Sequence, residues 1–98
     1  MADPGEVKDE AGKRFVLEVD GYEAELVYEL HGDRLVLIHT GVPDELGGRG
    51  LGGVLVQAAI DRAVAEGLTV IPKCPFARSW LEKHPDQAAR VTIVPPPS

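Results

Sequence analysis

The sequence predicts an α+β domain, in which a mixed, mainly antiparallel sheet of about four or five strands carries two helices. Apolar and polar residues alternate over residues 14–30, which is typical of strands that bury one face. A glycine-rich run over residues 46–53 leads directly into a helical pattern. A short apolar segment at residues 68–71 follows that helix, so we expect it to pair in parallel with the strand before the glycines.

Three strands precede the glycines and form a predicted meander. Residues 14–20 alternate between apolar and polar, Gly21 interrupts, and residues 22–30 alternate again with a glutamate-rich outer face. Residues 31–33 are typical of a turn. Residues 35–38 are apolar on both faces, so we expect this third strand to lie in the middle of the sheet.

The first predicted helix covers residues 54–66. Gly67 stands where a glycine ends a helix, and Pro75 stands where a proline begins the next helix, over residues 76–83. Residues 91–94 are compatible with a short edge strand. We expect the first helix to pack on the sheet through one small and apolar face, which consists of Gly52, Val56, Ala59, Ile60, Ala63 and Val64.

The length of 98 residues indicates one small domain. We assign residues 14–94 to this domain, residues 1–13 to a flexible N-terminal arm and residues 95–98 to a proline-rich tail. A core of this size is thin, which is compatible with pairing into a homodimer. The net charge of −6 argues against nucleic acid as a partner, because proteins that bind it cluster Lys and Arg.

From the sequence we also expect no membrane-spanning segment, no intrachain disulfide and no metal site. No apolar run approaches the roughly 18 residues of a membrane span, and no apolar leader stands at the N-terminus. Cys74 is the single cysteine, so no intrachain disulfide can form, which fits a reducing compartment and a cytoplasmic protein. The three histidines are scattered and no metal-binding spacing occurs, so we expect no metal site.

The glycine-rich run predicts a site for a phosphate group. It holds five of the chain's eleven glycines. Glycines let backbone N–H groups face an anion without Cβ atoms in the way, and the helix behind them adds its unpaired N–H groups and its positive end. A tight strand-to-helix turn without a ligand is the alternative.

Two phosphate-binding motifs do not fit this run. A Walker A loop needs Lys-Ser or Lys-Thr after the glycines, and neither follows. Gly48, Gly50 and Gly53 satisfy the pattern G-x-G-x-x-G. A dinucleotide fingerprint, however, follows the first strand of a βαβ unit, whereas a meander precedes these glycines.

The third candidate is a loop for the diphosphate of acyl-coenzyme A. At this run the chain resembles the GNAT superfamily of N-acetyltransferases, whose signature is [Q/R]-x-x-G-x-[G/A] between a central strand and a long helix. Gly50 and Gly52 occupy its two small positions, Arg49 stands just before them, and Gly47 stands at the leading Gln or Arg position. The backbone contribution to phosphate binding needs no side chain.

Further motifs narrow the resemblance to a minimal GNAT-like subfamily of short, single-domain members. That subfamily carries a His-Thr…Pro segment before the loop, which corresponds to residues 39–43 here. It also carries an (I/V)-P-x-C-P-F segment after the next strand, here residues 71–76, and a His-Pro pair, here residues 84–85. The resemblance covers residues 14–86 and implies a truncated GNAT fold.

The resemblance implies an acetyl-CoA-dependent N-acetyltransferase that acts on a primary amine, either a protein lysine or a small amine. The alternative is a non-catalytic module that binds acyl-CoA as a sensor or carrier. The residues expected to contact acetyl-CoA or coenzyme A are Thr40, Val42, Gly47, Gly48, Arg49, Gly50, Leu51, Gly52 and Gly53.

Cys74 and His39 are the candidate catalytic residues. Cys74 precedes the second predicted helix, so the positive helix end and the Lys73 cation favour its thiolate, which can attack a thioester. Alternatively, Cys74 lies beside a direct attack by the amine, or is a small buried apolar residue. His39 ends an apolar strand and is either a general base for the amine or thiol, or a structural residue.

Overall fold

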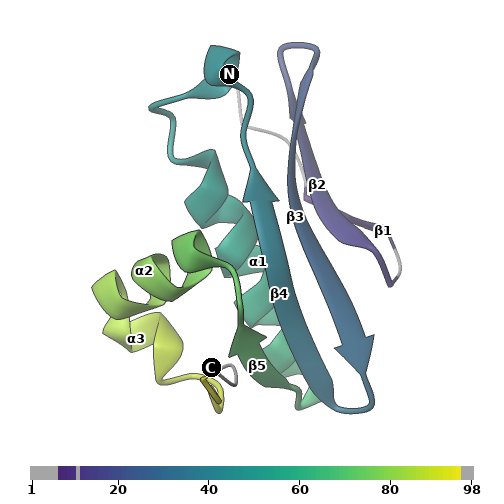
Figure 1. Cartoon of the computed structure of the whole chain (residues 1–98), viewed down its shortest axis with the longest axis vertical. Coiled ribbons are helices and arrows are strands. Elements are labelled where there is room, and N and C mark those ends of the chain that lie inside the picture. Colours follow the sequence, from purple (N-terminus) through teal and green to yellow (C-terminus); the bar gives the residue numbers. More distant parts are fainter. Residues whose placement is uncertain (1–6, 11, 96–98) are drawn as a thin grey trace.

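The computed structural model describes residues 7–10 and 12–95, and it forms a five-stranded sheet with the helices packed on one face (Figure 1). The strands lie side by side in chain order, and all neighbours are antiparallel except β4 and β5, which are parallel. The predicted mixed, mainly antiparallel α+β fold is therefore confirmed. The elements are β1 (Lys8–Glu10), β2 (Arg14–Val19), β3 (Tyr22–His31), β4 (Arg34–Gly41), the 3-10 helix η1 (Asp44–Leu46), α1 (Leu51–Glu66), β5 (Thr69–Pro72), α2 (Pro75–Lys83) and α3 (Pro85–Ala88).

One face of the sheet carries the core. Successive residues of a strand point to opposite faces, and the buried cluster takes every second residue of the central strands. The prediction that Val64 faces the sheet is wrong, because Val64 lies at the margin of the apolar stripe of α1 and is 44% exposed. The cluster includes Phe15, Leu17, Ala24, Leu26, Tyr28, Leu35 and Leu37 from the strands, and Leu55, Val56, Ala59, Ile60 and Ala63 from α1.

A β-bulge interrupts the regular pairing of β3 with β4. Val27 of β3 pairs with His39 of β4. The next residue of β3, Tyr28, pairs with Leu37, so Ile38 is an extra residue in β4. One extra residue reverses the faces of all residues that follow it, because side chains alternate with a period of two.

The bulge decides which way the end of β4 faces. Residues directly opposite each other in an antiparallel pair lie on the same face of the sheet. Thr40 pairs with Leu26, which is fully buried in the core, so Thr40 faces the helices. His39 and Gly41 therefore lie on the opposite face, which α1 and α2 leave open.

β4 and β5 separate halfway along β4. Their parallel pairing joins residues 34–37 to residues 69–72. Pro72 has no N–H to extend the ladder, and the chain then turns into α2, with the Cys74 N–H donating to the Leu37 carbonyl at 2.9 Å. Within the part of the chain that the structure describes, the second half of β4 therefore has no strand on its β5 side.

The two ends of the chain differ from the prediction. Residues 8–10, assigned to a flexible arm, form strand β1, which pairs with β2. Residues 1–6 and 11 of that arm, and residues 96–98 of the predicted tail, lie outside the described residues. Residues 91–94 form no strand and contribute one bridge to β5, while α3 is an additional short helix. No helix among the described residues is long and apolar enough to cross a membrane.

The hydroxyl of Tyr28 joins β1, β3 and α1. It donates to the Asp9 carboxylate, and it accepts from the Gly12 N–H at 3.1 Å and from the Arg62 guanidinium at 2.5 Å. Arg62 in turn pairs with Asp9 at 2.6 Å. Burial raises the pKa of Tyr28 above its ordinary value, and the Asp9 carboxylate adds to this effect.

Replacing Tyr28 with Phe should lower the free energy of unfolding by about 1–3 kcal/mol, because Asp9 and Arg62 lose their shared partner. Urea unfolding followed by circular dichroism measures this change. Since the folded-state pKa of Tyr28 is raised, the wild-type advantage is full below about pH 10 and is lost as the pH rises through the folded pKa. Tyr22→Phe is the control, because Tyr22 is 42% exposed, and it should cost less than about 0.5 kcal/mol. Equal losses from both variants would contradict this role of Tyr28.

Candidate functional site

The 3-10 helix η1 connects the end of β4 to the glycine-rich run. Leu46, the last residue of η1, is 1% exposed and anchors this segment in the core. Gly48 and Gly50 have φ angles of 80° and 71°, a left-handed conformation that other residues rarely adopt. The backbone then enters α1, with Gly50 as its N-cap.

Backbone N–H groups gather without acceptors at the start of α1. The first intrahelical bond runs from the Val54 N–H to the Gly50 carbonyl, and no side chain caps the helix. Among the described residues, the N–H groups of residues 48–53 have no acceptor. The first turn of α1 also contains no acidic residue that would offset its positive end. Uncapped N–H groups of this kind are the usual element of an anion site.

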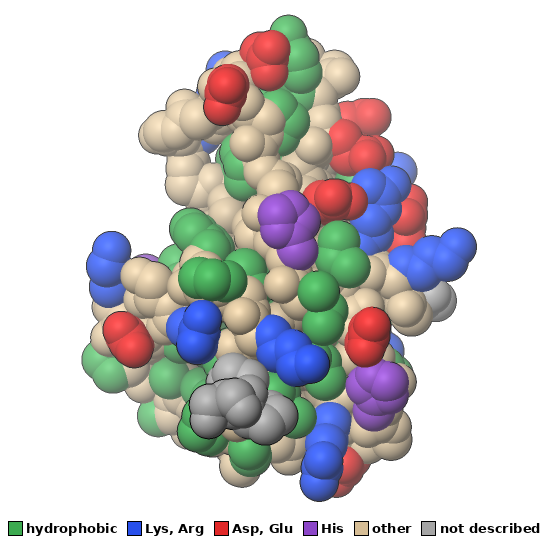
Figure 2. Space-filling view, in the orientation of Figure 1, with side chains coloured by type: hydrophobic (Ala, Val, Ile, Leu, Met, Phe, Trp, Pro, Cys, Tyr) green, Lys and Arg blue, Asp and Glu red, His purple; other side chains and the backbone are tan. Residues whose placement is uncertain are grey.

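A cavity of about 390 Å³ lies between this loop, the end of β4 and the start of α2, and Figure 2 shows the molecule hollowed beside the loop at its upper left. Of the residues expected to contact the cofactor, all except Arg49 and Gly53 line this cavity. The lining residues are Thr40, Val42, Pro43, Asp44, Leu46, Gly47, Gly48, Gly50, Leu51, Gly52 and Phe76. Contact of these residues with a cofactor stays a prediction.

Arg49 turns away from the cavity toward the turn between β2 and β3. Its guanidinium pairs with the Asp20 carboxylate at 2.8 Å, and both side chains are about half exposed or more. Arg49 therefore already has an anionic partner in this structure. A role for Arg49 in phosphate binding would require this exposed and weak ion pair to open.

Gly52 and Gly53 pack closely against α2, whereas the sequence predicted packing only for Gly52, and against the sheet. A Cβ at Gly52 would lie 2.7 Å from Cζ of Phe76, and a Cβ at Gly53 would lie 2.6 Å from Nε1 of Trp80. Both distances are too short for real contacts, so these glycines let α1 approach α2. Part of the glycine signal thus reflects helix packing, and Phe76, which lines the cavity, was not among the predicted site residues.

Cys74 is the N-cap of α2, as the position of Pro75 predicted. Its side chain is 3% exposed and does not line the cavity. The Cys74 thiol lies 3.3 Å from the hydroxyl of Thr40, which does line it. Thr40 therefore stands between the thiol and the cavity.

His39 is exposed on the open face of the sheet, whereas the Cys74 thiol contacts Thr40 on the helix face. A Cβ at Gly41 would lie 3.4 Å from Nε2 of His39, so the imidazole lies over the Gly41 backbone. A histidine activates a cysteine nucleophile through a direct hydrogen bond. The structure does not bring these two residues together in that way.

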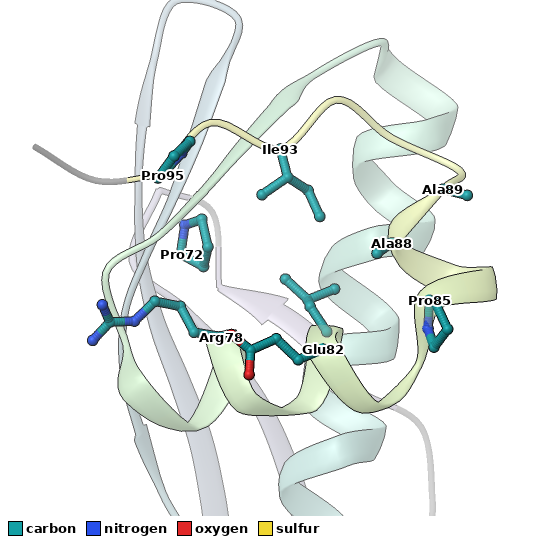
Figure 3. Close-up of a pocket in the computed structure, with 9 residues that line it drawn as sticks. Pro72, Arg78, Glu82, Pro85, Ala88, Ala89, Ile93 and Pro95 are labelled. Carbon is teal, nitrogen blue, oxygen red and sulfur yellow. The ribbon is translucent and has the colours of Figure 1, made fainter.

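A larger cavity of about 620 Å³ lies elsewhere, between α2, α3 and the end of the described chain (Figure 3). Its lining is mostly apolar, with Arg78 and Glu82 beside it (Figure 3). None of the predicted site residues lines it. None of the described residues that line it belongs to the run of N–H groups without acceptors, so we take the glycine loop as the candidate functional site. The described residues also contain no group of His, Cys, Asp or Glu suited to a metal ion.

The fold and the loop define a class of protein: a small α+β domain in which a strand with one unpaired edge leads into a glycine loop and the uncapped start of a helix. Comparison with known proteins identifies the class. The sequence model of the family described as GCN5-related N-acetyl-transferase matches residues 14–91. The chain belongs to this family, so the predicted GNAT resemblance and the assignment to N-acetyltransferases are confirmed.

Individual relatives agree with this assignment. Protein NATD1 of Gallus gallus and Protein NATD1 of Homo sapiens are each 35% identical over 80 residues, which cover 79% of this chain and 73% and 71% of those proteins. The solution structure of a GCN5-like protein from Staphylococcus aureus superimposes with a TM-score of 0.73 at 29% identity. That similarity covers 98% of this chain and 94% of the other.

A double-mutant cycle tests the close packing of Gly52 against Phe76. Alanine is favoured over glycine inside a helix by about 1 kcal/mol, so Gly52→Ala should stabilise the Phe76→Ala variant. In the wild-type background the clash with the ring should cancel or reverse that gain. We expect an interaction energy of at least about 1 kcal/mol from urea unfolding. Additive effects of the two substitutions would show that the ring does not limit this position.

Proposed function

We propose that the protein transfers an acetyl group from acetyl-CoA to a primary amine. Membership of the GNAT family supports the reaction class. The observation that carries the proposal for the cofactor is the run of N–H groups without acceptors over residues 48–53, at the edge of a glycine-lined cavity. A diphosphate offers the acceptors that these N–H groups lack.

The residues present fit the parts of acetyl-CoA. The N–H groups of residues 48–53 would hold the diphosphate, and both Gly48 and Gly50 border open space, since a Cβ at either position would meet no atom within 4 Å. The unpaired edge of β4 at Thr40, with Val42 beyond it, would bond the amides of the pantetheine arm. Asp44 lines the cavity and no Lys or Arg among the described residues does, so binding of an anion here would depend on the backbone N–H groups.

When bound, acetyl-CoA supplies a thioester whose acetyl group passes to the amine while the CoA thiol leaves. The protein must then supply a general base that accepts the proton lost by the amine. His39 lies near the end of β4 and is exposed on the open face of the sheet, so Nε2 would take this proton from an amine that enters from that face and would release it to solvent. The Thr40 hydroxyl, fixed by the Cys74 thiol, would orient the reacting end of the cavity.

Direct attack by the amine is favoured over an acetyl-cysteine route. Cys74 is 3% exposed, and Thr40 stands between its thiol and the cavity. His39 lies on the other face of β4 and cannot activate the thiol by direct contact in this arrangement. The carrier role of Cys74 stays a prediction that mass spectrometry can test.

The second candidate function is a non-catalytic acyl-CoA-binding module. The same loop supports it, because diphosphate binding requires no catalytic residue. Release of free CoA on addition of amines discriminates between the two functions, since only the transferase produces it.

The loop is tested with a matched pair of glycine variants. Gly50→Ala and Gly32→Ala both place a Cβ at positive φ in open space, so each should cost about 1 kcal/mol of stability. Only Gly50 borders the cavity, so only Gly50→Ala should weaken CoA binding in titration calorimetry, by about tenfold or more. Equal CoA affinity of the two variants would contradict diphosphate binding at this loop.

The catalytic roles are tested with Cys74, His39 and one control. His39→Gln should lower kcat about a hundredfold through loss of the base. His31→Gln, at an exposed histidine at the far end of β3, should leave kcat unchanged. Cys74→Ala should retain kcat within about fivefold, since the thiol only supports Thr40. An intact mass that is one acetyl group heavier after acetyl-CoA treatment, together with an inactive Cys74→Ala variant, would instead establish the acetyl-cysteine route.

A further inference from the structure

Gly41 leaves a notch on the open face of the sheet, next to the candidate base. Gly41 pairs directly with Glu25 of β3, so the position that would cover the Glu25 side chain has no side chain of its own. A Cβ at Gly41 would lie 3.4 Å from Nε2 of His39 and 3.7 Å from Oε2 of Glu25. An imidazole and a carboxylate therefore border the same empty position.

Arg14 holds the Glu25 carboxylate in a fixed orientation. Its guanidinium bonds Oε1 of Glu25 at 2.7 Å, Glu23 at 2.9 Å and Glu10 at 2.7 Å. These carboxylates raise the pKa of Arg14, with Glu10 as the largest cause, so the guanidinium keeps its charge. Oε2 of Glu25, the oxygen that faces the notch, accepts no hydrogen bond from any described residue.

The notch belongs to a cavity of about 340 Å³ that lies back to back with the glycine-loop cavity. Figure 2 shows acidic and basic side chains together over this part of β2 and β3. Val42 and Pro43 line both cavities, so a single segment separates them. A group held in the notch would lie at the end of β4, beside His39, on the face of the sheet opposite the glycine-loop cavity. The lining residues are Arg14, Glu23, Glu25, Gly41, Val42 and Pro43.

The charge of this cavity favours a cation. The lining carries two carboxylates, those of Glu23 and Glu25, and one guanidinium, that of Arg14, so one negative charge remains in excess. Glu10, the third partner of Arg14, does not line the cavity and also lies near Lys8 and Lys13. The side chains of Glu25 and Arg14 are 32% and 29% exposed, which keeps their charges partly shielded from water. A Cβ at Gly41 would already contact both His39 and Glu25, so the space directly over Gly41 suits a slender aliphatic chain that ends in an ammonium group.

We propose that the notch at Gly41 admits the acceptor of the reaction, a primary ammonium on a flexible aliphatic chain, and that Oε2 of Glu25 binds it beside His39. This inference rests on the proposed function, whose acceptor it defines. Gly41 and Glu25 are then residues that determine specificity, and Arg14 is a positioning residue. A lysine side chain and a linear polyamine both carry a primary ammonium on an aliphatic chain. The experiment below distinguishes these two acceptors.

The experiment compares the wild type with Glu25→Gln, Gly41→Ala and the control Glu29→Gln, with Nα-acetyl-lysine amide and spermidine as acceptors. A Cβ at Gly41 meets its neighbours at ordinary contact distances, so Gly41→Ala should fold normally. Glu29 lies on the same face of β3 and is 59% exposed, away from the notch. CoA release gives KM and kcat, titration calorimetry gives the CoA affinity, and amide and ring NMR shifts report acceptor binding without any reaction.

Glu25→Gln and Gly41→Ala should raise KM for the better acceptor about tenfold, with kcat changed less than about threefold and CoA affinity unchanged. Glu29→Gln should behave as wild type. Whichever acceptor shows the lower KM identifies the source of the ammonium. If Glu25→Gln matches Glu29→Gln, the inference is overturned while the proposed function stands.

If the wild type releases no CoA with either amine, the proposed transfer fails, and the NMR titration then decides the inference alone. Shifts at Gly41 and His39 that disappear in Glu25→Gln would support the notch as an ammonium site. Shifts that are absent, or that persist in Glu25→Gln, would overturn it.

Discussion

The separation of β4 from β5 is the constraint on which the rest of the site depends. Pairing stops at Leu37 and Pro72, because proline cannot donate to the ladder and the chain turns into α2. The strand edge beyond Leu37 is left unpaired, and a cavity opens between it and the start of α1. A strand inside a sheet is normally paired on both sides. The end of β4 is unpaired on its β5 side, so a ligand can add its own hydrogen bonds there.

The bulge at Ile38 acts together with this separation. Without it, the alternation from Leu37 would turn His39 toward the helices and Thr40 toward solvent. With it, Thr40 faces the Cys74 thiol, and His39 faces the open side of the sheet. One inserted residue thus divides the polar side chains of the candidate site between two faces, with the glycine-loop cavity on one side and the notch at Gly41 on the other.

Most of the framework was predictable because it follows local periodicity. The alternation in β2 and β3, the helix after the glycines and the parallel β5 were all expected, and each is confirmed. Strand β1 was missed because its residues are charged, and it is held by pairing with β2 and by the bond from Tyr28 to Asp9. Gly52 was expected on the face of the first helix that packs on the sheet and, with Gly53, as a ligand contact. The close approach of both glycines to the rings of α2 was not expected, because it depends on tertiary packing.

The sequence predicted which residues belong to the candidate site, but it did not predict how they are arranged in space. Motifs placed Thr40, Cys74 and the loop glycines in one region, and the structure gathers most of them around one cavity. The outward turn of His39 depends on a one-residue change of register, which no sequence period specifies. The ion pair of Arg49 with Asp20 likewise joins segments that are far apart in the chain.

The central claim is that backbone N–H groups over residues 48–53 bind the diphosphate of coenzyme A. An NMR titration of the ¹⁵N-labelled protein with CoA tests it most directly, because it reports each amide separately. The account predicts saturable shifts that are largest at residues 48–53 and smaller along residues 40–42. No shifts at millimolar CoA, or shifts centred on the apolar cavity between α2 and α3, would contradict it.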